Sequence, residues 1–159
     1  MSTSGLYVPP PLADETHGTA GVSDNLLAAG AGVYVALAGM SILLPEPGRY
    51  LLSADVRASI GGTPPVNAFV TARLFNVTAG AALPNSARIV TQANAQAPAV
   101  GDFADQSTAP IHEILTVTAP TTIRLEAAHF VTSGTVTVSN SVNSLTAGRN
   151  RLGYERIAL

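Results

Sequence analysis

The clearest pattern in this chain has a period of two, with apolar side chains alternating with polar ones over short runs. It is strongest in residues 49–59, 68–77 and 121–131. Because successive side chains of a β-strand point to opposite faces, the pattern predicts strands with one buried and one solvated face. The predicted buried positions are Tyr50, Leu52, Ala54, Val56, Ala58, Val70, Ala72, Leu74, Ile123, Leu125 and Ala127.

Further short runs of apolar or alternating residues follow one another from residue 26, separated by Gly, Pro and Asn turns such as IGGTPPVN at 60–67. About eight strands spaced in this way are typical of an antiparallel sandwich or barrel. Only residues 25–31 and 79–83 have the Ala and Leu content for a helical turn or two. The predicted strands are 32–44 (one or two strands), 49–59, 68–77, 87–93, 112–119, 121–131, 134–145 and 151–159.

Two segments lack strand periodicity. Residues 1–25 include Pro9, Pro10 and Pro11 and predict an extended N-terminal arm that precedes a β-domain at 26–159. The arm is either a disordered tail or a strap that becomes ordered on a neighbouring subunit. Residues 92–110 predict a long connection, and loops of that length are usually functional or disordered. We expect this loop to make contacts outside its own subunit.

Charge is scarce. Charged residues are 11% of the chain and hydrophobic residues 47%, whereas an ordinary soluble domain has about 25% charged residues. The chain is either a stable domain with a neutral surface or a subunit whose surface is largely covered by partners, and we favour the second. The net charge of −2 argues against a nucleic-acid partner. The chain has no apolar run of 18 residues and no signal-peptide pattern, so we expect no membrane association and synthesis in a cytoplasm.

The sequence offers little reactive chemistry. His17, His112 and His129 lack metal-ligand spacing, and Asp102 and Asp105 lack the further ligands of a calcium loop. No nucleophile elbow or phosphate loop is present, and there is no cysteine. We therefore predict no catalytic site, no metal and no cofactor. A carbohydrate-binding or hydrolytic domain is the weaker alternative, because the chain has no Trp and few other aromatic residues.

Three stretches carry a resemblance to a known family: PGRYLLSADV at 47–56, APTTIRLEAAHF at 119–130 and the closing YERIAL. Over about residues 30 to 159 the chain resembles the jelly roll shared by the complement and tumour-necrosis-factor superfamily and by trimeric capsid-decoration and fibre proteins of tailed bacteriophages. It lacks the cysteines, tryptophan and stalk of the animal proteins, so the viral proteins are the nearer match. The resemblance implies an all-β, antiparallel jelly-roll sandwich that assembles as a homotrimer.

The function that the resemblance implies is capsid decoration. A homotrimer would bind the major capsid protein on the outside of a phage head and stabilise the shell, without catalysis. The alternative is a receptor-binding tip or head fibre, which is disfavoured because a fibre normally needs a shaft. The candidate site residues are Leu6, Tyr7, Val8, Pro9, Pro10, Pro11 and Leu12 in a capsid-binding arm, Asp102, Phe103 and Asp105 in a capsid-contact loop, and Arg149, Arg151 and Arg156 at a trimer interface.

Overall fold

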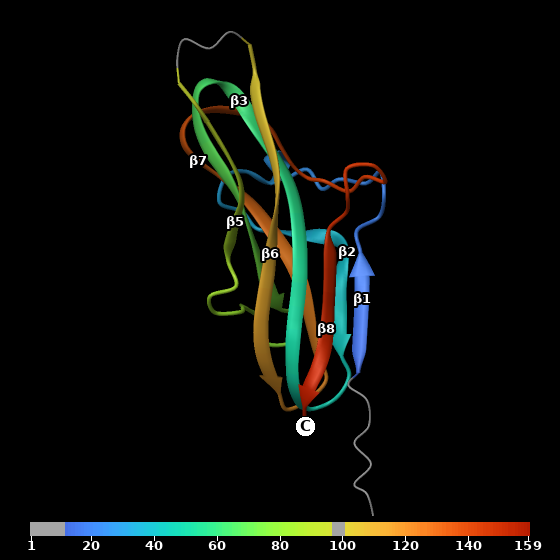
Figure 1. Ribbon diagram of the computed structural model, residues 1–159. Helices are drawn as coiled ribbons and strands as arrows, with labels where there is room; N and C mark the ends of the chain where they lie inside the picture. Colours follow the sequence, from blue (N-terminus) through green and yellow to red (C-terminus); the bar gives the residue numbers. More distant parts are fainter. Residues whose placement is uncertain (1–11, 97–100) are drawn as a thin grey trace, which may run out of the picture.

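The protein is an all-β molecule in its computed structural model, which describes residues 12–96 and 101–159 (Figure 1). The predicted fold class, an antiparallel jelly-roll-like sandwich of about eight strands, is confirmed. Its strands are β1 (Ala13–His17), β2 (Val35–Leu44), β3 (Gly48–Asn76), β4 (Ala81–Ala82), β5 (Arg88–Ala95), β6 (Phe103–Val117), β7 (Thr121–Ser141) and β8 (Arg151–Ala158).

Helix is confined, in the described part of the chain, to one 3-10 turn, η1 (Leu27–Ala29). This turn confirms the prediction for residues 25–31. The prediction for residues 79–83 is wrong, because Ala81 and Ala82 form β4 and pair with the end of β3. Nowhere in the described ranges is a helix both long and apolar enough to cross a membrane.

The long strand β3 organises the fold. Figure 1 shows β3 rising along the molecule, curling over at the top and running back down. The curl falls at the predicted turn of residues 60–67. Strand β7 bends with β3, because their pairing continues on both sides of the curl, from Thr63 with Thr135 to Asn67 with Ser133. The predicted turn is therefore confirmed as a reversal of chain direction, although β3 stays paired with β7 on both sides of it.

Two glycines allow the β3–β7 ribbon to bend so sharply. A Cβ atom at Gly62 would lie 2.0 Å from the Thr135 carbonyl oxygen, and one at Gly134 would lie 2.0 Å from the Pro65 carbonyl oxygen. Gly134 also has a φ of 79°, in the left-handed region that side chains disfavour. Only glycine fits these two backbone approaches.

The two halves of β3 belong to two layers. The first half pairs with β6 on one side and, up to Asp55, with β8 on the other, and β1 extends that layer beyond β8. Nearer the curl, residues 58–63 pair with β7. The second half pairs with β5 and β7, and β2 extends that layer beyond β7. Between the layers lies the core. The predicted buried positions of β3 and β7 are all at most 1% exposed, which confirms the alternation.

Two predicted irregular segments contain strands. The long connection predicted at 92–110 is wrong, because β5 continues to Ala95 and β6 begins at Phe103. Residues 103–108 of β6 are all exposed, so they show no apolar alternation although they pair with β3. In the predicted arm, Ala13–His17 form β1 and pair with β8, and the Leu12 carbonyl accepts a hydrogen bond from the Arg156 N–H at 2.7 Å.

Candidate interaction surfaces

The first outer face, which we call the polar face, is built by the outward side chains of β1, β8, β6 and the first half of β3. Arg151 is its centre, with one guanidinium nitrogen 2.8 Å from the Asp55 carboxylate and another 3.4 Å from that of Glu15. Glu15 also lies 3.1 Å from the His17 ring. These side chains are each 36% exposed or more, so solvent screens the ion pairs and each stabilises the fold only slightly.

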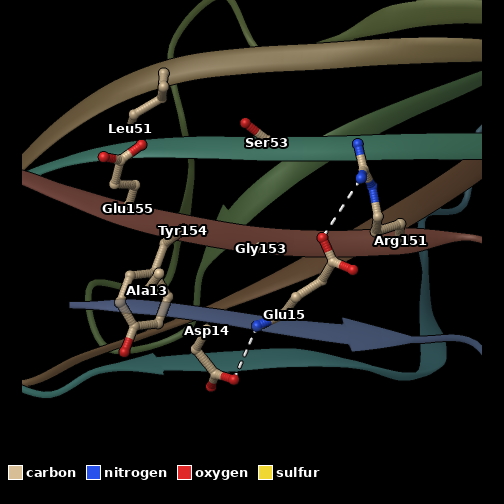
Figure 2. Close-up of a pocket in the computed structure, with 9 residues that line it drawn as sticks. All are labelled: Ala13, Asp14, Glu15, Leu51, Ser53, Arg151, Gly153, Tyr154 and Glu155. Atoms are coloured by element: carbon tan, nitrogen blue, oxygen red, sulfur yellow. Dashed lines mark hydrogen bonds and ion pairs between the residues drawn. The ribbon is translucent and has the colours of Figure 1, made fainter. Parts of the chain in front are cut away.

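A shallow depression of about 570 Å³ lies on this side of the molecule, between β1, β8 and β3 (Figure 2). Gly153 adds no side chain between Ser53 and Glu15, which helps to leave the space open. Glu15, Glu155 and Arg151 point to the outer side of the strands, whereas the Asp14 side chain points to the opposite side with Tyr154 (Figure 2), so two carboxylates and one guanidinium give the depression a negative local charge. The residues that line it are Ala13, Asp14, Glu15, Leu51, Ser53, Arg151, Gly153, Tyr154 and Glu155.

The second outer face, which we call the arginine–aromatic face, is built by the second half of β3, by β7 and by the residue before β2. It consists of Tyr34, Phe69, Arg73, Phe75, Arg124, Glu126 and Phe130. Phe69 and Phe130 pair across the strands and stack at a centroid distance of 5.2 Å, with 13° between their planes. Tyr34 meets Phe130 edge-on at 6.2 Å.

Glu126 is the buried residue of the arginine–aromatic face, with 2% of the residue exposed. Its Oε2 atom accepts hydrogen bonds from Arg73 Nε at 2.9 Å and Nη2 at 2.8 Å. Its Oε1 atom accepts from Arg124 Nε at 2.8 Å and Nη2 at 2.6 Å. One carboxylate thus holds two guanidinium groups through charge-assisted hydrogen bonds, which are the stronger kind.

Aromatic rings also lie against the two guanidinium groups. The Arg73 guanidinium lies 3.6 Å from the Tyr34 ring centroid, and that of Arg124 lies 4.6 Å from the Phe75 centroid. Both distances are within the range of cation–π attraction. Burial raises the pKa of the Tyr34 hydroxyl above its ordinary value of 10.0, and the nearby Arg73 opposes this with a smaller effect.

Exposed aliphatic side chains border the arginine–aromatic face. Ile89 of β5 pairs with Thr71 and is 58% exposed, and Leu43 of β2 pairs with Thr122 and is 53% exposed. Val33 directly precedes Tyr34 and is also exposed. Aromatic residues and arginine are enriched at the cores of protein–protein interfaces, where acidic residues and lysine are depleted. The composition of this face is therefore that of a binding surface.

Of the sequence-predicted arm and loop residues, the structure describes only Leu12 and the three loop residues. Leu6, Tyr7, Val8, Pro9, Pro10 and Pro11 are outside the described residues, and Leu12 is exposed just before β1. Asp102, Phe103 and Asp105 are exposed at the start of β6. Asp102 Oδ1 accepts a hydrogen bond from the Thr63 hydroxyl at 2.9 Å, and Asp105 Oδ1 accepts one from the Gln106 N–H at 2.8 Å.

The three C-terminal arginines do not form one cluster. Arg151 and Arg156 lie at opposite ends of β8, about 17 Å apart for five residues of strand. Arg156 is only 13% exposed in its side chain and binds the Glu46 carboxylate and the Pro47 carbonyl. Arg149 is exposed in the turn before β8. Their role at a trimer interface stays a prediction.

The histidines are also separated. His17 contacts Glu15, His112 lies 3.3 Å from the Ser53 hydroxyl, and His129 is buried with its Nδ1 atom 3.1 Å from the Leu26 carbonyl oxygen. In residues 12–96 and 101–159, no three or more His, Asp or Glu side chains come together in a group that could hold a metal ion.

Sequence reasoning missed the arginine–aromatic face. The signal was present, because Phe69, Arg73 and Phe75 occupy the odd positions of a strand whose even positions are apolar. The corresponding outward positions of the 121–131 run are Arg124, Glu126 and Phe130. Three of the four phenylalanines of the chain thus lie on outward positions of two strands. The period of two predicts the outward direction, but it does not predict that the two strands are neighbours.

Comparison with known proteins identifies the fold. Neither a protein-family model nor a curated protein matches the sequence. Among solved structures, the chain is similar to a chain in the structure of the infectious bursal disease virus Gx strain, with a TM-score of 0.51 and 16% identity. The Gt strain gives a TM-score of 0.49 and 17% identity. Both alignments cover 92% of this chain but only about a third of the viral chain, 32% and 33%. The similarity to the Gx-strain chain shows that the two share a fold.

Proposed function

We propose that this chain is a viral structural protein, and specifically a capsid decoration protein that binds the outside of a phage head as a homotrimer. The observation that carries the proposal is the fold shared with a chain of a virus structure, at a TM-score of 0.51. The low charge of the chain and the binding composition of the arginine–aromatic face support a role in assembly.

The proposed action needs burial of apolar surface and main-chain pairing, and no catalytic step. Contact with the major capsid protein is assigned to residues 6–12 of the N-terminal arm. Its three prolines favour an extended conformation at low entropic cost, and Leu6, Tyr7, Val8 and Leu12 supply apolar side chains. Such a segment can add a strand to a sheet edge or lie in a groove between subunits. Three arms on one trimer would bind with a high effective concentration.

Reconstitution on undecorated phage heads tests this function. The purified chain should co-sediment with the heads, raise their resistance to heat and appear at threefold positions in images of the particle. Absence of density on the capsid, with density at the tail instead, would contradict decoration and favour the receptor-binding tip.

A truncation tests the arm separately. Deleting residues 2–11 leaves β1 and its pairing with β8 intact, so the body should fold. The truncated protein should keep the number of subunits of the full-length protein in light scattering and should bind the heads more weakly. Equal binding by the two proteins would show that the arm is not the anchor.

A further inference from the structure

This inference rests on the homotrimer of the proposed function and identifies the contact that holds it together. We propose that the segment Asp102–Asp105 of one copy docks on the arginine–aromatic face of a second copy, where one of its carboxylates meets Arg73 and Arg124. The segment, which we call the acidic tip, contains Asp102, Phe103, Ala104 and Asp105.

The arginine–aromatic face has unused capacity for an anion. Two guanidinium groups share the single carboxylate of Glu126, so the three groups carry a net charge of +1. Each arginine uses only Nε and Nη2 in these bonds, and a guanidinium has five N–H donors in all. Within the described residues, the remaining donors of Arg73 and Arg124 have no hydrogen-bond acceptor. A carboxylate from outside the chain would complete them.

The two guanidinium groups are also held in place before any partner arrives. Glu126 binds both of them, and the rings of Tyr34 and Phe75 lie against them. Their side chains are 26% and 35% exposed, so they remain accessible to a partner. A preorganised pair of this kind loses little conformational entropy on binding. The adjacent stacked rings of Phe69 and Phe130 offer an apolar contact beside the charged one.

The acidic tip has the complementary chemistry. Five of the ten acidic residues form ion pairs within the chain, namely Glu15, Glu46, Asp55, Glu113 and Glu126. Asp102 and Asp105 form none among the described residues, and their carboxylates accept hydrogen bonds only from neutral donors. Phe103 lies between them and is 39% exposed. Phe103 and Asp105 are two residues apart in β6 and therefore lie on the same side of the strand. The tip thus offers a carboxylate and an aromatic ring to a face that has a positive charge and aromatic rings.

Shape distinguishes the tip from the other acidic region, the depression on the polar face. Glu155 there also lacks an ion pair in the described part of the chain, but it lines a hollow. Residues 101–108 are all exposed, and Figure 1 places the start of β6 at the upper end of the molecule. An exposed strand end can reach a sheet face of a neighbour, whereas a hollow needs a protrusion to fill it. The tip is thus the better occupant.

The contact is heterologous, because the tip and the face are different parts of the same chain. Each copy offers its face to one neighbour and its tip to the other, and such contacts form a closed ring when the rotation between copies closes. A homotrimer then contains three identical contacts of this kind.

The double variant Asp102→Asn, Asp105→Asn tests the proposal. Both side chains are exposed and keep an acceptor oxygen, so the monomer fold should be preserved. Light scattering over a dilution series should show a trimer for the unmodified chain. The variant should dissociate at a protein concentration roughly tenfold or more above that at which the unmodified trimer dissociates, which is the effect expected from the loss of a close charge pair. The matched control is Glu155→Gln, an exposed acid in the depression, which should leave the trimer unchanged.

A mixing experiment tests the pairing of tip with face. The variant Arg124→Gln keeps the tip, and the double tip variant keeps the face. Neither should form trimers alone at micromolar concentration, but an equimolar mixture should form a dimer through the one intact contact. If the tip variant remains a trimer, or if only Glu155→Gln dissociates, the tip-to-face contact is refuted, but the homotrimer itself is not. A monomeric unmodified chain refutes both.

Discussion

The two outer faces come from two halves of one strand and differ in how they hold their charges. In the first half of β3 the outward Asp55 belongs to an exposed set of ion pairs around Arg151. In the second half the outward Arg73 shares a buried carboxylate with Arg124 and lies against aromatic rings. The inner sides of both halves are equally buried. The sandwich therefore constrains only the inward residues, and the outward residues are available for two different surfaces.

The largest difference between the faces should appear when one carboxylate is replaced on each. Glu126→Gln keeps the shape but places an amide among donors that need an acceptor, so the free energy of unfolding should fall by about 2 to 3 kcal/mol. Asp55→Asn on the polar face should lower it by about 0.5 kcal/mol or less, because solvent screens that pair. Urea unfolding measures both. Equal losses would show that the two networks are energetically alike.

An aromatic truncation should have the next largest effect. Phe130→Ala removes the stack with Phe69 and the edge contact with Tyr34, and it should lower the free energy of unfolding by about 2 kcal/mol. Leu51→Ala, at a half-buried position of the polar face, should lower it by about 1 kcal/mol. Thermal unfolding of both variants checks the order. A larger loss for Leu51→Ala would reverse the ranking of the two faces.

A smaller effect should follow from filling the depression of the polar face. In Gly153→Ala the new Cβ atom would lie 3.0 Å from the Asp14 carbonyl oxygen, so β1 must move slightly away from β8. The expected loss is about 1 kcal/mol, with faster hydrogen exchange confined to residues 13–17. Ser53→Ala, which adds no atoms to the same depression, is the control and should leave β1 unchanged. Unaltered exchange in Gly153→Ala would show that β1 tolerates the shift.

The smallest effect concerns alkaline pH. Burial raises the pKa of Tyr34 in the folded protein above 10.0, so folding favours the neutral hydroxyl. This contribution to stability is fully present below pH 10 and is lost as the pH rises through the raised folded pKa. Burial, and more weakly Asp14, also raise the pKa of Tyr154. Tyr34→Phe should therefore reduce, without abolishing, the loss of stability above about pH 10 in denaturant titrations. An unchanged pH profile would contradict this assignment.

The apolar–polar alternation correctly predicts which side chains are buried wherever a strand crosses the core. Tyr50, Val70 and Leu125 were predicted to be buried from the period of two alone, and each is fully buried. The same rule failed for residues 103–108 of β6, which are exposed on both sides and are held by main-chain pairing with β3. A strand that extends past the core has no apolar face, so its sequence looks like that of a loop.

Alternation is also limited in what it predicts for outward residues. The alternation of residues 121–131 predicts a solvated side that carries Arg124 and Glu126, but Glu126 is buried. The side chains that contact Glu126 include Arg73, which is 53 residues away in the sequence. No local pattern contains that contact, because it depends on which strands the fold places side by side.

The sequence by itself therefore determined the strands that cross the core, their inward residues and the reversal at residues 60–67, because each follows from local side-chain direction and turn chemistry. Only the tertiary structure decided which outward residues meet. The pairing of β3 with β7 places Arg73 beside Glu126 and Phe69 beside Phe130. Cross-strand neighbours are set by topology and register, and these depend on the whole chain burying its apolar surface together.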